Sequence, residues 1–320
     1  MGISYEMRTM GNKKGYLIDL NVTINRLRKS VISRLKMKTS HKITYSFLFV
    51  MKKLMSALST KTRYCFASRL ASLSYHYIPK RKGQVIKNLN RAFSSWSDEK
   101  IESTVKKIYI FFMHNMVQFF AFPKSWAGIK IEISGKDVLD STMTHGKGCV
   151  LVSAHFGVWE LFAKWMGEYG TRFVGIAHRQ KNRGANRFFQ EQRELAGGEH
   201  IFRKEPLEKM YDVLKNNGIL ALVSDQDAKR KGIFVDFFGT PSSTPKGAAL
   251  FHQKSGAPMV FGVCIQTGFQ KYRIEFVPII SKSDSTQDIT QAFTFIIEEK
   301  VRQYPEQYFW FHRRWKTKQD

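Results

Sequence analysis

Short apolar runs alternate with amphipathic segments along the chain from about residue 148 onward. The runs have the length and composition of buried strands, and the segments between them repeat apolar residues at helical spacing. Strands are predicted at 149–153, 173–177, 200–202, 219–224, 258–265 and 272–279. Helices are predicted at 157–168, 183–196, 206–217, 246–255 and 286–303. Alternation of this kind predicts an α/β fold with a sheet covered by helices on both faces.

The preceding part of the chain predicts a helical region instead. Residues 62–122 are typical of helix throughout, and one helix is expected to begin after Ser97, with acids in its first turn. Residues 43–58 carry an apolar stripe at helical spacing, with Lys52 and Lys53 outside it. The stripe consists of Phe47, Leu48, Val50, Met51, Leu54, Met55 and Leu58. It indicates either a helix packed on the domain or a helix lying in the plane of a membrane.

These patterns divide the chain into three regions. Residues 1–42 form a basic extension with ten Lys and Arg against two acids, and some helix is expected within 20–37. Residues 43–122 form a helical region expected to associate with a membrane, and residues 123–320 form the α/β domain. No signal peptide is expected, and no segment is predicted to cross a bilayer. The uncharged run 108–123 is shorter than the roughly 20 apolar residues that a span requires.

The charge of the chain points to anionic partners. Its 52 Lys and Arg exceed its 26 Asp and Glu, so the formal net charge is +26. Such a charge suits nucleic acid, an anionic membrane surface, or an acidic substrate or carrier protein. The many aromatic residues suit a membrane interface or single-stranded nucleic acid. Nucleic acid is disfavoured, because no recognised motif for it is present and the basic residues are spread along the chain.

The cysteines and the standard catalytic motifs exclude several kinds of site. Cys65, Cys149 and Cys264 lie in separate apolar runs without metal-ligand spacing, and they are expected to be buried thiols of a reduced compartment. The chain has no His-Glu-x-x-His motif, no Gly-x-Ser-x-Gly elbow and no phosphate-binding loop. No metal or organic cofactor is therefore expected.

The strongest candidate for chemistry is the pair His155 and Glu160, where the strand predicted at 149–153 passes into a helix. Open α/β sheets bind ligands beyond the carboxyl ends of their strands. Five residues separate the pair by about 140° on an ideal helix, so they meet only if His155 lies in the turn before it. A carboxylate on one ring nitrogen would leave the other free to take a proton from a hydroxyl. The alternative is a structural histidine at the edge of the core.

A second polar cluster follows the fourth predicted strand. Asp225 and Asp227 come first, and the basic run 229–231 follows them. A solvated turn with offsetting charges explains this cluster equally well. However, an aromatic loop at 233–238 comes next, and the helix predicted at 246–255 begins with free N–H groups that could hold an anion. A charged site beside an apolar slot would suit a lipid.

Two further groups combine charge with aromatic character. Arg179 follows a predicted strand, where it could bind a phosphate or form a surface ion pair. For the neighbouring His178 a structural role is favoured. The segment 305–318 mixes aromatic and basic residues, which is typical of a membrane-interface belt or a docking patch for an acidic carrier. A structural role is also the simplest interpretation of His312 within it.

Five blocks in fixed order carry a resemblance to a known family. They are IPKRKGQVIKNLNRAF, SAHFGVWELF, HRQKNRGANRFF, DQDAKRKGIFVDFFGTPSSTPKGAALFHQKSGAP and PEQYFWFHRRWK. Over residues 47–317 the chain resembles the bacterial late lipid A acyltransferases of the lauroyl and myristoyl type, with their lysophospholipid-acyltransferase-like relatives. The resemblance implies a glycerolphosphate-acyltransferase-like mixed sheet flanked by helices, preceded by a helical region.

The resemblance also implies roles for individual residues. His155 matches the catalytic histidine of the family, and Glu160 matches the acid of its His-x-x-x-x-Asp/Glu motif. Arg179 falls on the arginine of the next block. The Asp-Gln-Asp block is matched by Asp225, Gln226, Asp227 and Arg230. The residues implied to bind substrate are Arg179, Asp225, Asp227 and Arg230.

Two positions depart from the family pattern. A glycine is common where Lys229 stands, so the turn there is expected to differ. The N-terminal membrane span of the family is reduced here to residues 43–58, which contain Lys52 and Lys53.

The implied activity is transfer of a fatty acyl group from an acyl carrier protein or coenzyme A thioester to a hydroxyl of a lipid A precursor or related glycolipid. His155 would act as the base, Glu160 would support it, and Arg179 and Arg230 would hold acceptor phosphates. No acyl-enzyme is required, and the sequence does not identify an oxyanion donor. The alternatives are a lysophospholipid, aminolipid or other glycolipid acceptor, and, outside catalysis, a nucleic-acid-binding protein or membrane scaffold.

The implied location is the cytoplasmic face of a bacterial inner membrane, with peripheral or monotopic attachment. The expected partners are acyl carrier protein, a lipid acceptor and an anionic membrane surface, without nucleic acid. The sequence predicts no particular oligomeric state.

Overall fold

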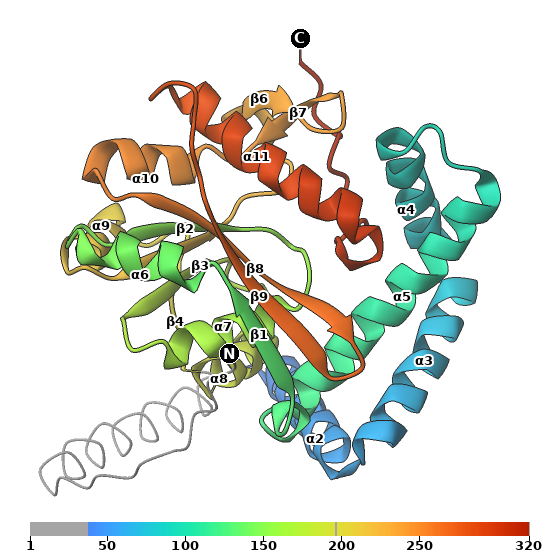
Figure 1. The fold of residues 1–320 in the computed structure, drawn as a ribbon. Coiled ribbons are helices and arrows are strands. Elements are labelled where there is room, and N and C mark those ends of the chain that lie inside the picture. Colours follow the sequence, from blue (N-terminus) through green and yellow to red (C-terminus); the bar gives the residue numbers. More distant parts are fainter. Residues whose placement is uncertain (1–37, 196, 320) are drawn as a thin grey trace, which may run out of the picture.

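A seven-stranded sheet runs through the centre of the computed structural model, which describes residues 38–195 and 197–319 (Figure 1). The strands follow the order β1-β9-β8-β2-β5-β3-β4. Their bounds are Lys130–Ser134 (β1), Cys149–Ser153 (β2), Phe173–Ala177 (β3), Glu199–Phe202 (β4), Ile219–Val223 (β5), Met259–Gly268 (β8) and Lys271–Pro278 (β9). Only β8 and β9 pair antiparallel; the other neighbours are parallel. The predicted α/β fold with a mixed sheet is therefore confirmed.

Helices cover both faces of this sheet (Figure 1). Their bounds are Lys136–Thr144 (α6), Trp159–Glu168 (α7), Arg183–Leu195 (α8), Leu207–Lys215 (α9), Gly247–Ser255 (α10) and Thr286–Gln303 (α11). Short 3-10 turns are Lys124–Trp126 (η1), Lys229–Lys231 (η2) and Pro305–Gln307 (η3). All six strands and five helices predicted for this part of the chain are present, with ends displaced by a few residues at most.

Four elements of the α/β part were not predicted from the sequence. Strand β1 pairs only with β9 at the edge of the sheet, and it is largely exposed, so it lacks an apolar run. Helix α6 follows it. The segment predicted as an aromatic loop is instead a hairpin of β6 (Ile233–Asp236) and β7 (Pro241–Thr244). Its second strand consists of proline and small hydroxyl residues, which do not indicate a strand by hydrophobicity.

Strand β2 shows how the two cores are separated by the sheet. All five of its residues are buried. Val150 and Val152 belong to one apolar core, whereas Cys149 and Leu151 belong to the other. Successive side chains of a strand point to opposite faces, so one run of apolar residues contributes to both cores.

The helical region consists of four helices rather than one continuous helical stretch. They are Thr39–Ala57 (α2), Thr60–Tyr77 (α3), Pro79–Ala92 (α4) and Asp98–Ala121 (α5). Ser97 caps α5 as predicted, and its hydroxyl accepts a hydrogen bond from the N–H of Lys100 at 3.3 Å. Residues of α3, α4 and α5 share one apolar core with the sheet. The boundary expected at residue 122 stays a prediction, and the helix expected within 20–37 lies outside the described residues.

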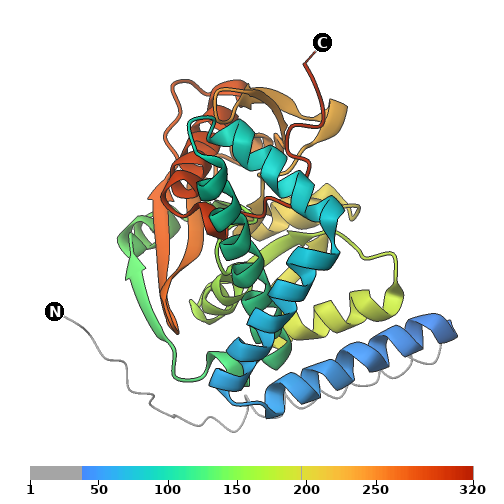
Figure 2. The ribbon, with the colours of Figure 1, turned by 90° about the vertical axis from the view of Figure 1, so that its right-hand side faces the viewer.

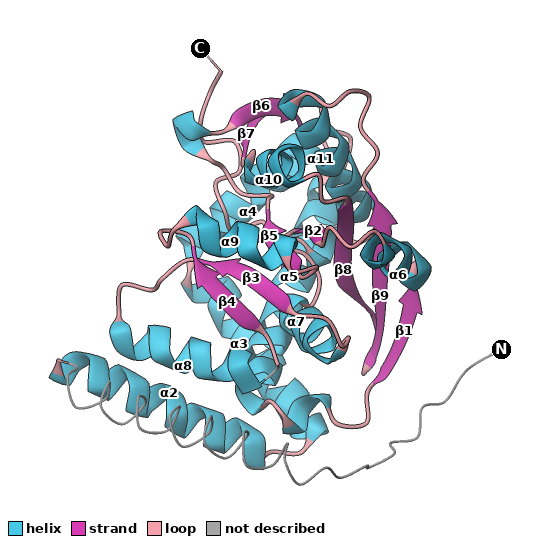
Figure 3. Ribbon diagram, turned by 90° about the vertical axis from the view of Figure 1, so that its left-hand side faces the viewer, coloured by secondary structure: helices cyan, strands magenta, loops and turns pink. Residues whose placement is uncertain are grey.

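Helix α2 lies alongside α8 at the bottom of the molecule (Figures 2 and 3). Tyr45 and Met55 of α2 are buried against the protein. On another side of the helix, four apolar side chains are each more than half exposed: Ile43, Phe47, Val50 and Leu54. The predicted apolar stripe is thus divided between a packed face and an exposed face. Within the described residues, none of the helices combines the length and hydrophobicity that a membrane span requires.

The cysteine prediction is correct for two residues and wrong for the third. Cys149 and Cys264 are buried in the sheet, whereas Cys65 is exposed on α3. Helix α3 is short of apolar residues on that side, so the local run did not reveal its orientation. Burial raises the pKa of the Cys149 thiol to about 12, which keeps it protonated at neutral pH.

The approach of α2 to α8 depends on Gly184, and this dependence can be tested by substitution. A methyl group at Gly184 would overlap the backbone carbonyl of His41 in α2, so the helices would have to separate. We expect Gly184→Ala to lower the free energy of unfolding in urea by about 1–3 kcal/mol. The matched control is Gly83→Ala in α4, where a methyl group would meet no heavy atom within 4 Å. It should raise stability by about 0.5–1 kcal/mol; equal effects of both changes would contradict the packing described.

Candidate active site

The pairing of β2 with β5 brings His155 and Asp225 together. Ser153, the last residue of β2, lies in register with Val223, the last residue of β5. His155 and Asp225 each follow their strand by two residues, at the same edge of the sheet. The ring Nδ1 of His155 lies 2.8 Å from Oδ1 of Asp225. The backbone N–H of His155 donates to the same oxygen at 3.0 Å.

This geometry leaves one ring nitrogen of His155 available to accept a proton. A carboxylate on Nδ1 holds the proton there, so the lone pair of the neutral ring lies on Nε2. Among the described residues Nε2 has no hydrogen-bond partner, and the side chain of His155 is 33% exposed. The carboxylate of Asp225, by contrast, is almost completely buried. An oriented imidazole with an open nitrogen can act as a general base.

The electrostatics of the pair favour its charged form. Burial lowers the pKa of His155, but the charge and hydrogen bond of Asp225 more than offset it, so the net pKa is raised. Burial raises the pKa of Asp225, and its interactions with His155 reverse this, so the net pKa is lowered. The stabilisation by Asp225 is present above the unfolded-state pKa of aspartate and is lost as pH falls through the lowered pKa of Asp225. The stabilisation by the charged His155 ring is lost as pH rises through the raised pKa of His155, so the pair stabilises the fold between these limits.

The prediction that Glu160 contacts the ring of His155 is wrong. The carboxylate of Glu160 lies 3.3 Å from the guanidinium of Arg193 in α8, and it accepts a hydrogen bond from the indole of Trp159. Glu160 lies in the first turn of α7 and faces α8, whereas His155 precedes that helix and leans towards β5. A catalytic role for Glu160 stays a prediction.

Arg193 was not identified as a site residue from the sequence. Its positive charge lowers the pKa of His155, which places the guanidinium in the electrostatic surroundings of the ring. It lies in α8, four residues beyond the block HRQKNRGANRFF, and nothing in the local spacing distinguishes it from the other basic residues there. Only the packing of α8 against α7 brings it to Glu160.

Arg314 is a second residue that sequence reasoning missed. Its side chain is 2% exposed, and it donates to the carbonyl of Ser243 at 2.7 Å and to the hydroxyl of Thr244. Its charge helps to lower the pKa of Asp225. The only signal in the sequence was its position in the block PEQYFWFHRRWK, which was assigned no individual role. Arg314 thus supplies a buried positive charge behind the His155–Asp225 pair.

The turn after His155 is held by two distant segments. Phe309 donates its backbone N–H to the carbonyl of His155 at 2.9 Å. Gly157 and Val158 donate to the carbonyls of Gln307 and Cys264, respectively. Gly157 has φ +65°, and a methyl group there would overlap the carbonyl of Cys264. The N–H groups of His155, Gly157 and Val158 are therefore all occupied and do not form an oxyanion hole.

The structure places the predicted substrate-binding residues around this edge but not in one cluster. Asp227 accepts a hydrogen bond from Thr317 through Oδ2 at 3.1 Å, and its buried Oδ1 has no partner among the described residues. Arg230 is exposed on η2 and lines a hollow with Phe234, Thr317 and Lys318. The side chain of Asp227 is thus tied to the C-terminal segment, whereas Arg230 faces solvent.

Arg179 lies at the same sheet edge, beyond β3. The order β2-β5-β3 puts it on the far side of Asp225 from His155. Its guanidinium lies over the ring of Phe202, 4.3 Å from the ring centroid. His178 beside it is exposed, and its Nδ1 contacts the carbonyl of Arg179. The structure gives His178 no place in the site, as the sequence analysis favoured.

Lys229 occupies a backbone conformation that favours glycine. Its φ is +56°, in the left-handed region. This backbone conformation is strained for a lysine, and the expectation that the turn differs from that of the family stays a prediction.

Among the described residues no group of three or more His, Cys, Asp and Glu side chains is arranged to hold a metal ion. The titratable groups around the site are instead organised in pairs, namely His155 with Asp225 and Glu160 with Arg193.

Residues 33–317 match the family model described as bacterial lipid A biosynthesis acyltransferase. The chain belongs to this family. The match spans both members of the His155–Asp225 pair. It confirms the resemblance that the five sequence blocks carry.

Curated relatives of the chain are named as transferases of acyl groups. A phosphatidylinositol mannoside acyltransferase of Mycobacterium tuberculosis is 28% identical over 192 residues, which are 57% of this chain and 59% of the relative. The chain therefore spans less than two thirds of the mycobacterial proteins that it matches. A lipid A biosynthesis palmitoleoyltransferase of Escherichia coli K12 is 24% identical, covering 79% of this chain and 85% of the relative. A lauroyltransferase of lipid A biosynthesis from the same strain is 23% identical, with 78% and 83% covered.

The pairing of Asp225 with His155 makes a prediction for the titration of the ring. Asp225→Asn removes the charge that raises the pKa of His155, whereas the burial that lowers it remains. The NMR titration midpoint of the His155 ring should therefore fall in Asp225→Asn. Glu160→Gln should displace it less, because Glu160 makes no contact with the ring. A larger downward displacement in Glu160→Gln than in Asp225→Asn would show that the wrong acid has been paired with the histidine.

Proposed function

We propose that the protein transfers a fatty acyl group from a thioester to a hydroxyl of a lipid or glycolipid acceptor. The observation that carries the proposal is the His155 ring, bonded through Nδ1 to a buried Asp225 and open at Nε2, in a chain of the acyltransferase family. A base with this geometry can activate an alcohol without any metal ligand set. The site lies at the carboxyl end of parallel strands, where α/β sheets bind their ligands.

The proposed step is direct transfer. Nε2 of His155 removes the proton of the acceptor hydroxyl while its oxygen attacks the thioester carbonyl. Asp225 stabilises the imidazolium that forms. The tetrahedral intermediate then collapses, the carbon–sulfur bond breaks, and the imidazolium returns the proton to the leaving thiolate. The products are an ester and a free thiol, so the bonds and protons balance.

A covalent acyl-enzyme is not part of the proposal. Cys149 and Cys264 are buried, and burial raises the pKa of both thiols. Cys65 is exposed on α3, and among the described residues it makes no hydrogen bond with His155. A nucleophilic residue would have to be within reach of His155 to be activated by it.

We assign the Glu160–Arg193 pair to stabilisation of negative charge beside His155. Glu160 holds the guanidinium of Arg193 at 3.3 Å, and Arg193 acts on the ring electrostatically. A positioned cation near the reacting carbonyl would favour the oxyanion that develops there. Arg179 and Arg230 are proposed to bind acceptor phosphates, because both are exposed and both follow strands at the edge of the sheet where His155 lies.

The acceptor class is proposed from the names of the relatives, and the donor class is proposed from the family resemblance. The relatives are named for lipid A and phosphatidylinositol mannoside acylation, so a lipid A precursor or a related glycolipid is the proposed acceptor. Acyl carrier protein or coenzyme A is the proposed carrier of the thioester. The proposed location is the cytoplasmic face of a bacterial inner membrane.

The proposed attachment to the membrane is through α2. Its exposed stripe of Ile43, Phe47, Val50 and Leu54 could enter the interface while Tyr45 and Met55 hold the helix on the protein. The formal net charge of +26 would add attraction to anionic lipid.

Catalysis is tested by removing the base and its partner. We expect His155→Ala to lower kcat/KM by about 10²–10⁴-fold, since a general base of this type contributes that much. Asp225→Asn should lower it by roughly 10²-fold or more, because the tautomer and charge of the ring are no longer held. The assay is mass spectrometry of products from carrier-protein and coenzyme A thioesters with a panel of lipid acceptors.

The matched control for catalysis is His178→Ala, which removes an exposed histidine at the same edge. It should retain the transfer rate. A folded His155→Ala protein with full transfer activity would exclude the proposed mechanism.

Membrane attachment is tested with vesicles of zwitterionic and anionic lipid. Phe47→Ser with Leu54→Ser should weaken binding about tenfold or more, because two apolar side chains leave the interface. Phe295→Ser with Ile280→Ser is the control, since these apolar residues, 56% and 82% exposed, lie on α11 and the loop before it. Binding to anionic vesicles should also fall as salt is added. If both double variants bind like the unaltered protein, α2 is not the attachment surface.

A further inference from the structure

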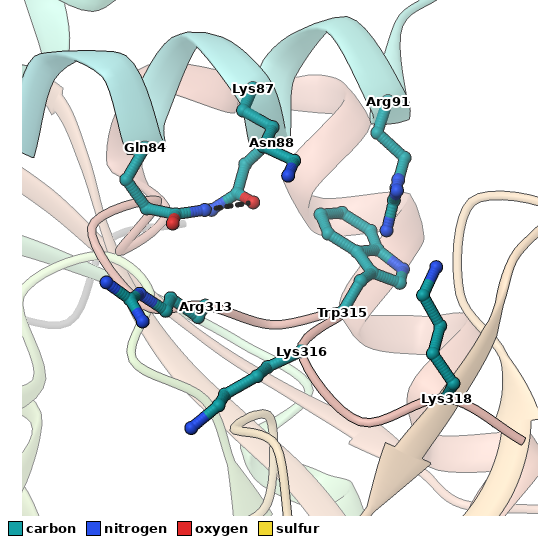
Figure 4. Close-up of a pocket in the computed structure, with 8 residues that line it drawn as sticks. All are labelled: Gln84, Lys87, Asn88, Arg91, Arg313, Trp315, Lys316 and Lys318. Atoms are coloured by element: carbon teal, nitrogen blue, oxygen red, sulfur yellow. Dashed lines mark hydrogen bonds between the residues drawn. The ribbon is translucent and has the colours of Figure 1, made fainter.

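A hollow of about 420 Å³ lies between α4 and the C-terminal segment, apart from the His155 ring (Figure 4). Figure 4 shows Gln84, Lys87, Asn88 and Arg91 descending from the helix, opposite side chains from the segment below it. The opposite wall consists of Arg313, Trp315, Lys316 and Lys318. A volume of this size suits a small polar group of a ligand rather than a protein surface.

The charge of the hollow is its most unusual feature. Five of its lining residues are Lys or Arg and none is Asp or Glu. Among the described residues the side chains of these five form no hydrogen bond or ion pair, and Arg91 lies only over the indole ring of Trp315. Elsewhere in the described chain many cations are paired with acids one helical turn away, as Lys136 is with Asp140. Cations that line one hollow without an acid repel one another, so a bound anion would relieve them.

A second observation at the hollow also indicates an anionic ligand. Trp315 is 94% buried, since its exposed fraction is 6%, yet its indole N–H has no acceptor among the described residues. Figure 4 shows this nitrogen on the side of the ring towards Lys318. A buried donor without an acceptor is uncommon in native proteins and needs an explanation. An oxygen of a ligand that takes the place of the side-chain atoms covering this nitrogen would provide one.

The frame of the hollow is rigid. Asn88 is buried and donates to the carbonyls of Trp310 and His312, both at 2.7 Å, which ties the C-terminal segment to α4. The amide of Gln84 donates to Asn88 at 2.9 Å. Arg314, on the other side of the segment, is anchored to the β7 hairpin strand. The cations are thus carried on two elements whose separation is set by buried hydrogen bonds.

The hollow is connected to the proposed active site through the same segment. Phe309 binds the carbonyl of His155, and Thr317 binds Asp227. Lys318 lines both this hollow and the neighbouring one that contains Arg230. A ligand in the hollow would therefore lie on the Asp225 side of the site.

We propose that the hollow between α4 and residues 313–318 binds a phosphate ester carried by one of the two substrates. Phosphate matches the site because it brings two negative charges and several acceptor oxygens, which guanidinium and ammonium groups bind together. The inference rests on the proposed acyl transfer for the identity of the ligand as a substrate. The phosphate belongs either to the lipid head group or to the thioester donor.

The first test measures binding of inorganic phosphate by calorimetry at low ionic strength. Lys87→Gln, Lys316→Gln and Lys318→Gln are combined in one protein, because these exposed lysines make no contacts that the fold requires. The control combines Lys130→Gln, Lys215→Gln and Lys271→Gln, which removes the same charge from exposed positions on β1, α9 and β9. The hollow variant should bind phosphate about tenfold more weakly than the unaltered protein, and the control should be unchanged. Equal binding by all three proteins would overturn the proposal.

The second test identifies which substrate carries the phosphate. In steady-state assays, a KM raised about tenfold for a phosphorylated acceptor, and not for its dephosphorylated form, indicates the lipid head group. A similar rise for the thioester donor alone indicates the donor. In both cases the control variant should keep the KM values of the unaltered protein. Weaker phosphate binding with both KM values unchanged would reject a substrate as the occupant.

Failure of this inference is distinguishable from failure of the proposed function. His155 does not line the hollow, so His155→Ala should bind inorganic phosphate like the unaltered protein. A protein without any acyl transfer, but with phosphate binding that depends on the three lysines, would reject the proposed reaction and retain the anion site.

Discussion

The hydrogen bond between the Nδ1 of His155 and Asp225 is the contact on which the rest of the site depends. It exists because β2 and β5 pair in parallel with their last residues in register, so that two turns begin side by side. It also determines which ring nitrogen can accept a proton. The turn after the histidine is then held by β8 and by residues 307–309, which explains why the C-terminal segment belongs to the site. A slip of either strand would separate the acid from the base.

Burying Asp225 has an electrostatic cost that its surroundings offset. An isolated carboxylate in the interior would tend to take up a proton, whereas here the imidazole and Arg314 keep its pKa low. Arg314 is itself buried, and its hydrogen bonds to the β7 strand secure it. Positive and negative groups therefore alternate from the partly exposed His155 ring through Asp225 to the buried Arg314. Removing one member would leave an uncompensated buried charge, which is more harmful than the loss of a surface pair.

The basic residues of the chain fall into three groups that differ in their surroundings. One group forms ordinary surface ion pairs along helices, a second is buried beside the active site, and a third lines a hollow without acids between α4 and the C-terminal segment. Together with the exposed apolar stripe of α2, this distribution provides separate surfaces for lipid and for anionic groups. A composition of +26 alone does not distinguish these surfaces.

The sequence by itself determined the alternation of strands and helices, the helix cap at Ser97, and the position of His155 and Asp225 after strands, because these features depend on local periodicity and spacing. The family resemblance rests on ordered blocks and was equally accessible. Strand order was not, because it depends on pairing between segments some seventy residues apart. The sequence therefore offered Glu160, the nearest acid along the chain, as the partner of His155. Only the tertiary structure determined that Asp225 is the acid that contacts His155, that Glu160 faces Arg193, and that Arg314 lies near the pair.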